Sequence, residues 1–228
     1  MKILMIMTSH GQLGNTGKKT GFWLEEFAAP YYQFIDAGVE VVLASPAGGQ
    51  PPVDPKSVSE DLQTDATRRF EKDIDARTML SNTRKLSLIV PDAFDAVFFP
   101  GGHGPLWDLA DNPETARLIE YFYQQKKPIG VVCHAAAVLC QAMDGDHPLV
   151  SGKRLTGFSN SEEAAVDLTS VVPFSIEDRL IELGASYFKA DDWTPYVEVA
   201  AGIISGQNPA SSDVTASVLM DAVRGEVV

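Results

Sequence analysis

Short runs of consecutive apolar residues alternate along the chain with longer segments in which apolar residues recur every three or four positions. The runs predict buried strands, and the longer segments predict amphipathic helices. Strands are expected at residues 2–8, 39–44, 95–99 and 128–132, with an extended segment at 152–158 and short strands near 185–188 and 196–205. Helices are expected at residues 21–37, 111–127, 176–183 and 211–223, with a short one after residue 159. This alternation predicts an α/β fold with a doubly wound, mostly parallel sheet sandwiched by helices.

The first predicted helix has the clearest helical pattern, and Gly38 ends it at the expected position. Its apolar residues share one face, namely Leu24, Phe27, Ala28, Tyr31 and Ile35. Residues 56–86 are charged and only partly helical in pattern. The length of 228 residues suits one substantial α/β domain. We therefore expect a single domain, 1–228, in which residues 50–90 form a cap-like insertion that covers the site.

The junction at Cys133 and His134 is the main candidate for chemistry. A buried strand ends there and an Ala-rich segment, expected to be helical, follows without a loop. Such a strand-to-helix elbow exposes its central side chain at the carboxyl edge of the sheet. A helix N-terminus would also favour the thiolate. Cys133 is thus the candidate nucleophile and His134 its partner; the alternative is an inert cysteine in a core strand.

A glycine turn follows the strand at 95–99 and can face the same crevice. Gly101 and Gly102 allow the backbone to approach a ligand closely. The amides of Gly102 and His134 would form an oxyanion hole for a carbonyl attacked by Cys133. Gly101 and His103 are candidate substrate contacts. The alternatives are a tight turn without chemistry and a structural or exposed histidine.

Composition and charge narrow the possible partners. Hydrophobic residues make up 45% and charged residues 21%, as in ordinary globular proteins. The net charge of −13, with no basic stripe, argues against a nucleic acid or an anionic membrane as partner. The apolar run at 3–7 is too short to cross a membrane, and the N-terminus does not resemble a signal peptide. We expect a cytoplasmic protein.

The usual cofactor and metal motifs are missing from the sequence. No G-x-G-x-x-G follows the first strand, and the glycine-rich loops lack the Lys-Ser/Thr of a P-loop. The four histidines, His10, His103, His134 and His147, show no metal-ligand spacing. The two cysteines do not form a disulfide framework, and Cys140 is expected to be a packing residue. We predict no cofactor and no catalytic metal.

Three segments together resemble a known family: 98–104 (FFPGGHG), 132–134 (VCH) and 20–26 (TGFWLEE). They are similar to the ThiJ/PfpI superfamily, and within it to the glutathione-independent glyoxalase branch, also described as heat-shock protein 31 type chaperones. The resemblance covers nearly the whole chain. It implies a flavodoxin-like, glutamine amidotransferase-like fold and a homodimer.

The resemblance also implies roles for individual residues. The family nucleophile falls on Cys133 and the following histidine on His134. The family places a glutamate in the first helix four residues before a proline, and Glu26 has that spacing to Pro30. Helical phase alone does not separate Glu26 from Glu25, because both lie off the apolar stripe.

A second acid in this branch orients the catalytic histidine. It lies five residues after the phenylalanine of a Thr-Gly-Phe segment, which corresponds to Glu163 here. Glu162 is the alternative if the short helix is offset by one residue. Without the motif, both would be interpreted as exposed acids at a helix start.

The chain departs from the family pattern in one place and from related amidotransferases in another. Ala135-Ala136 stand where family members often have Gly-Pro, which affects the fit of the elbow to substrate. Glutamine amidotransferases of this fold need a His-x-Glu near the C-terminus, and no histidine follows His147. Glutaminase activity is therefore not expected.

The resemblance implies conversion of methylglyoxal or a similar 2-oxoaldehyde to a 2-hydroxy acid through a cysteine hemithioacetal. Glu26, held protonated near the sulfur, would assist the proton transfer. The alternative is a stress-protective chaperone, or a redox-sensing or protein-deglycating protein that uses the same cysteine. We expect a small-molecule substrate.

Overall fold

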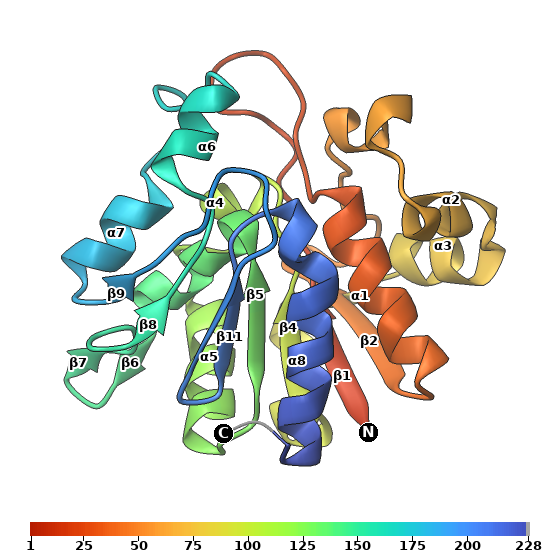
Figure 1. The fold of residues 1–228 in the computed structure, drawn as a ribbon. Coiled ribbons are helices and arrows are strands. Elements are labelled where there is room, and N and C mark those ends of the chain that lie inside the picture. The colour runs from red at the N-terminus through yellow and green to blue at the C-terminus, as the bar shows by residue number, and fades with distance from the viewer. Residues whose placement is uncertain (227–228) are drawn as a thin grey trace.

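The computed structural model describes residues 1–226. Their central element is a seven-stranded sheet with helices packed around it (Figure 1). The strand order is β10 (Val197–Ala200), β11 (Ile203–Gly206), β5 (Ile129–Val132), β4 (Ala96–Phe99), β1 (Lys2–Ile6), β2 (Glu40–Ser45) and β3 (Arg84–Lys85). Adjacent strands are parallel apart from the antiparallel pair β10 and β11. The predicted α/β fold with a mostly parallel sheet is confirmed.

Helices cover both faces of this sheet. They are α1 (Leu24–Asp36), α2 (Asp65–Lys72), α3 (Ile74–Ser81), α4 (Pro105–Asp108), α5 (Pro113–Gln124), α6 (Asn160–Ala165), α7 (Ile176–Glu182) and α8 (Ser212–Arg224). Short 3₁₀ helices span Pro55–Val58, Glu60–Leu62, Leu86–Leu88, Pro91–Ala93, Cys133–Gln141 and Pro209–Ser211. Two small strand pairs complete the fold: β6 (Met143–Asp144) with β7 (His147–Pro148), and β8 (Arg154–Leu155) with β9 (Ser186–Tyr187). Figure 1 shows α1 and α8 side by side over one face.

The central strands β1, β4 and β5 are predominantly apolar because both of their faces are buried. In β1, Leu4 and Ile6 contribute to one hydrophobic core, and Ile3 and Met5 contribute to the other. The first core lies against α5 and the 3₁₀ helix that follows β5, and the second lies against α1 and α8. Burial on both faces removes the alternation of polar residues and leaves the continuous runs seen in the sequence.

Two predicted elements differ from the structure. The strand expected at 196–205 is a hairpin, β10 and β11, whose turn places Ala201 and Gly202 at positive φ. The Ala-rich segment after β5 is a 3₁₀ helix, Cys133–Gln141, and not an α-helix. Its residues from Cys133 to Leu139 are buried, so packing on all sides rather than helix propensity determines its form.

The segment expected to form a cap-like insertion, residues 50–90, divides into three parts. Residues 54–64 reach the pocket described below. Helix α2 packs against α1, with α3 beside it (Figure 1). Arg84 and Lys85 then pair with β2 and extend the sheet as β3. Only the first part of the segment therefore lies at the site.

Among residues 1–226, no helix has the length and the apolar character needed to cross a bilayer.

Candidate active site

Cys133 lies at a strained elbow at the carboxyl end of β5. Its φ of +58° is in the left-handed region, which a residue with a side chain rarely adopts. Strand β5 ends at Val132 and the 3₁₀ helix begins at the next residue, so the chain turns within one position. The turn aims the thiol into a pocket while leaving only 3% of the residue exposed. This is the predicted nucleophile elbow.

The glycine turn after β4 lies beside this elbow because β4 and β5 are neighbours in the sheet. Gly102 and His103 line the pocket, but Gly101, which was expected to contact substrate, is not among the lining residues. The N–H of Gly101 donates a hydrogen bond to Oε2 of Glu26 at 2.7 Å. A Cβ at Gly101 would lie 2.5 Å from the same oxygen and 2.6 Å from the carbonyl oxygen of Val132. The turn therefore requires glycine at this position.

Glu26 is fully buried and directed at Cys133 from α1. It interacts with the thiol, and its Oε1 has no other hydrogen-bond partner among the described residues. Burial raises the pKa of Glu26 to about 8, although the thiol and the Gly101 amide act in the opposite direction. At neutral pH the carboxyl therefore carries a proton. Glu25, by contrast, lines the pocket and accepts a hydrogen bond from Thr64.

The resting thiol of Cys133 is protonated, contrary to the expectation of a favoured thiolate. Burial raises its pKa well above the usual value, and the neighbouring Glu26 adds to this effect. The backbone amides of Gly102 and His134 oppose the increase, as expected for donors that would stabilise negative charge. The amide dipoles at the elbow do not stabilise a resting thiolate, because the cost of removing the sulfur from water outweighs them.

His134 connects the thiol to a carboxylate. Its Nδ1 lies 3.2 Å from the sulfur of Cys133, and its Nε2 lies 2.7 Å from Oε2 of Glu163. The carboxylate can only accept, so Nε2 carries the proton and Nδ1 is left free to accept one from the thiol. Burial, assisted by the nearby His103, lowers the pKa of His134 to about 4 although Glu163 acts to raise it, so the ring is neutral at pH 7.

Glu163 is shared between two histidines. Its Oε1 accepts a hydrogen bond from Nε2 of His103 at 2.8 Å, while Oε2 accepts the one from His134. Burial tends to raise the pKa of Glu163, but the two imidazoles outweigh it and hold the pKa at about 2. The rings of His103 and His134 lie 3.9 Å apart, centroid to centroid. His103, expected only as a substrate contact, thus also fixes the acid.

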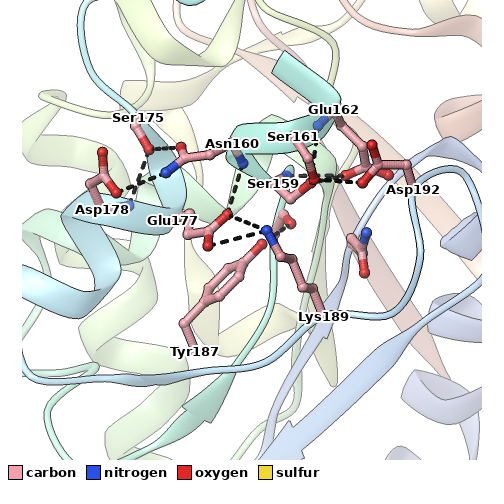
Figure 2. Close-up of polar contacts among 12 residues, drawn as sticks. Ser159, Asn160, Ser161, Glu162, Ser175, Glu177, Asp178, Tyr187, Lys189 and Asp192 are labelled. Carbon is pink, nitrogen blue, oxygen red and sulfur yellow. Dashed lines mark hydrogen bonds and ion pairs between the residues drawn. The ribbon is translucent and has the colours of Figure 1, made fainter. Parts of the chain in front are cut away.

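Glu162 points away from the histidines, although it is adjacent in sequence. Its Oε2 accepts hydrogen bonds from the backbone N–H of Ser159 at 3.1 Å and from the hydroxyl of Ser159 at 2.9 Å. Its Oε1 accepts from the backbone N–H of Trp193 at 2.9 Å and from Nδ2 of Asn208 at 2.8 Å. Figure 2 shows Glu162 among the polar contacts around α6. The structure therefore brings Glu163, and not Glu162, to His134.

The pocket above Cys133 has a volume of about 660 Å³. Its inner end contains Cys133, His134, Gly102 and His103, and its wall is predominantly apolar. The apolar part of this wall is formed by Leu13, Trp23, Leu62, Phe158, Val166, Leu168, Trp193, Pro209 and Ala210. An apolar pocket with a few convergent polar groups and shifted pKa values is the usual form of a small-molecule site.

His103, His134 and Glu163 could also hold a metal ion, since each offers one ligand atom and these atoms lie within 4.8 Å of one another. No spacing pattern in the sequence indicates this cluster, because its members come from three separate segments. Here the two Nε2 atoms already donate to Glu163, so a metal would have to displace both protons. The observed contacts fit an imidazole–carboxylate network.

Sequence reasoning missed two residues of the site, Trp193 and Asn208. Trp193 lines the pocket from a loop between β9 and β10, and Asn208 contacts both Glu162 and the carbonyl oxygen of Thr194. No motif marks Trp193, which lies outside the three segments that carry the family resemblance. The segment Gly206-Gln207-Asn208-Pro209 also resembles the family, and it is the signal that could have indicated Asn208.

Comparisons with known proteins find relatives over nearly the whole chain. A sequence profile of the DJ-1/PfpI family matches residues 19–213. The curated "Glyoxalase 3" of Candida albicans is 27% identical, over 97% of this chain and 98% of that protein. The crystal structure of Rapid Encystment Protein 24 KDa (REP24) of Francisella tularensis is 37% identical with a TM-score of 0.93, over 97% of this chain and 98% of that one. Glyoxalase III of Candida albicans has a TM-score of 0.90 at 27% identity, over 97% of both chains.

Proposed function

The chain belongs to the DJ-1/PfpI family, and from this premise we propose that it is a glutathione-independent glyoxalase that converts methylglyoxal and similar 2-oxoaldehydes to 2-hydroxy acids. One observation carries the proposal: the sulfur of Cys133 lies 3.2 Å from a neutral imidazole nitrogen, at the inner end of an apolar pocket. The names of the relatives support it, since Glyoxalase 3 of Candida albicans aligns over nearly its whole length.

The reaction begins with the addition of sulfur to the aldehyde carbon. Nδ1 of His134 takes the thiol proton as the sulfur of Cys133 bonds to C1 of the substrate. The former carbonyl oxygen gains negative charge and then a proton, which gives a hemithioacetal. The amides of Gly102 and His134, which already favour negative charge on the sulfur, are suited to stabilise this oxygen.

Transfer of a proton from C1 to C2 completes the internal redox change. His134 removes the C1 proton to give an enediol and returns a proton to C2, which leaves a 2-hydroxy thioester on Cys133. Water then hydrolyses the thioester, releasing the 2-hydroxy acid and restoring the thiol. Glu163 holds the imidazole in its orientation through the bond to Nε2. When the sulfur becomes anionic, protonated Glu26 stabilises it by donating a hydrogen bond.

The direct test is lactate formation from methylglyoxal in the absence of glutathione. The wild-type protein should form lactate, and Cys133→Ala should lower kcat/KM by at least roughly 10³-fold, because the covalent intermediate is lost. Cys140→Ala is the matched control, since Cys140 lies in the same 3₁₀ helix, is partly buried and is not among the residues lining the pocket. Turnover that survives in Cys133→Ala would rule out the mechanism.

We also propose that the protein acts in the cytoplasm and that it forms a homodimer, of which the dimer is implied by the family resemblance. Its exposed apolar residues, which include Leu88 at 75% and Val90 at 67% exposure, offer surface that a second copy could cover. Light scattering after size-exclusion chromatography distinguishes a dimer from a monomer of 24.7 kDa.

A further inference from the structure

The pocket is much larger than methylglyoxal requires. A three-carbon oxoaldehyde occupies on the order of 100 Å³, the volume of a few water molecules. The cavity measures about 660 Å³, a size typical of sites that enclose drug-sized ligands. Most of the pocket would remain filled with water above a bound methylglyoxal, in contact with a largely apolar wall.

An aromatic wall extends from the reacting groups into this extra space. The ring of Phe158 lies 4.2 Å from that of His134, centroid to centroid, and the indole of Trp193 meets Phe158 edge to face at 5.8 Å. Val166 and Leu168 line the same pocket. A planar apolar group attached to C2 of the substrate could lie along Phe158 and Trp193 while its aldehyde reaches Cys133.

Trp193 is held in place at a backbone conformation that bulky residues avoid. Its φ is +65°, in the left-handed region, and its N–H donates to the buried Glu162 at 2.9 Å. Such an outlier persists only where the surroundings determine it, and outliers of this kind cluster at ligand sites. The backbone that carries the indole is therefore set by the fold before a ligand arrives.

The loop that carries Trp193 is anchored on both sides of the indole. Before it, Nζ of Lys189 lies 3.1 Å from Glu177, and Asp192 accepts a hydrogen bond from the hydroxyl of Ser161 at 2.5 Å (Figure 2). After it, the carbonyl oxygen of Thr194 accepts from Nδ2 of Asn208 at 2.9 Å. Preorganisation of this kind lowers the entropic cost of binding a rigid ligand.

The charged residues of the pocket do not favour an ionic substituent. The lysines Lys18, Lys19 and Lys56 are matched by the acids Glu25, Asp54 and Asp213. A phosphate or carboxylate on the substrate would meet both signs of charge. This balance of positive and negative side chains favours an uncharged substituent on the substrate.

Resting on the proposed function, we propose that the preferred substrates are 2-oxoaldehydes with a neutral aromatic substituent, and that Trp193 is a specificity-determining residue that contacts this substituent. The group would replace water along Phe158 and Trp193. The aldehyde and ketone carbons would meet Cys133 and His134 as they do for methylglyoxal.

The test compares phenylglyoxal with methylglyoxal as substrates. Wild-type kcat/KM should be at least about tenfold higher for phenylglyoxal than for methylglyoxal, and Trp193→Ala should lower the phenylglyoxal value about tenfold more than the methylglyoxal value. Trp193→Phe should retain most of the preference. Phe188→Ala is the matched control. Phe188 is an exposed aromatic residue near the same loop, and its ring packs on Arg154. Equal losses for both substrates in Trp193→Ala, or no wild-type preference, would overturn the proposal.

A binding measurement separates this proposal from the proposed function. Calorimetry should show that the wild-type protein binds mandelate, the aromatic 2-hydroxy acid, at least about tenfold more tightly than lactate, and that Trp193→Ala abolishes the difference. If neither oxoaldehyde is turned over but this preference is present, the glyoxalase function fails and the aromatic pocket stands. If methylglyoxal is turned over and mandelate binds no better than lactate, the glyoxalase function stands and the aromatic preference fails.

Discussion

Two buried carboxyl groups approach the Cys133–His134 pair from different helices, and at neutral pH one is protonated while the other is ionised. Glu26, from α1, has one amide donor and the thiol as partners, and burial raises its pKa to about 8. Glu163, from α6, is bonded to two imidazoles, and its pKa falls to about 2. Burial keeps the first carboxyl neutral because its few donors do not offset it, whereas the two imidazoles keep the second carboxyl ionised although it too is buried.

The difference matches two chemical tasks. A neutral carboxyl beside a sulfur can donate a hydrogen bond when the sulfur becomes anionic. An ionised carboxylate beside an imidazole fixes the tautomer and stabilises the ring when it becomes protonated. Such divergent pKa values in one site are the usual sign of an acid and a base with separate roles.

The largest expected effect comes from removing the titration of Glu26. Its pKa is about 8 in the folded protein against the usual 4.5, so its contribution to stability is complete below pH 4.5 and is lost as the pH rises through 8. As the pH rises from 5 to 8, ionisation of this carboxyl should lower the unfolding free energy of the wild-type protein by about 4 kcal/mol. Glu26→Gln should not show this loss. Urea unfolding at the two pH values measures it, and identical pH slopes for the two proteins would mean that Glu26 is not neutral.

The next effect concerns the ionised partner. Glu163→Gln should lower kcat/KM for methylglyoxal by about 10²-fold, because the imidazole loses its orientation and its charge partner. Since Glu163 acts to raise the pKa of His134, the acidic limb of the pH profile should move to lower pH.

Glu162→Gln is the matched control for that experiment. This variant should destabilise the fold through the Ser159 and Trp193 contacts, yet leave the acidic limb where it is in the wild type. A shift of the limb in Glu162→Gln and not in Glu163→Gln would reverse the assignment of the two acids.

The smallest effect tests how firmly α6 carries Glu163. The hydroxyl of Ser159 caps this helix by accepting a hydrogen bond from the N–H of Glu162 at 3.2 Å. Ser159→Ala should cost about 1 kcal/mol of unfolding free energy. The rate on methylglyoxal should change less than about threefold if the histidine bonds alone hold Glu163. A rate loss as large as that of Glu163→Gln would show that the cap positions the acid.

Local sequence patterns were sufficient for the sheet and the elbow. Apolar runs marked the central strands because both faces are buried, and the abrupt change of pattern at Cys133 marked the elbow. Glu26 needed the family resemblance, because helical phase left it equivalent to Glu25. The hairpin at Ala201-Gly202 was missed because its single glycine has no Pro, Asn, Asp or second glycine beside it and interrupts an otherwise apolar stretch.

The electrostatics of the site could not be predicted from local sequence. The pKa of Cys133 depends on burial by segments distant in the chain and on Glu26. Trp193 lies in an irregular loop, and its position depends on a hydrogen bond to a residue 31 positions earlier. Neither effect has a periodic pattern that sequence reasoning could detect.

The close packing around Gly101 has a consequence for how such a protein can change over time. The floor of the site admits no added carbon, because a Cβ there would collide with Glu26 and with the main chain at Val132. The outer wall, which includes the half-exposed Trp193, faces solvent and has room for other side chains. Substitutions can therefore diversify which molecules are accepted while the reaction itself is inherited unchanged.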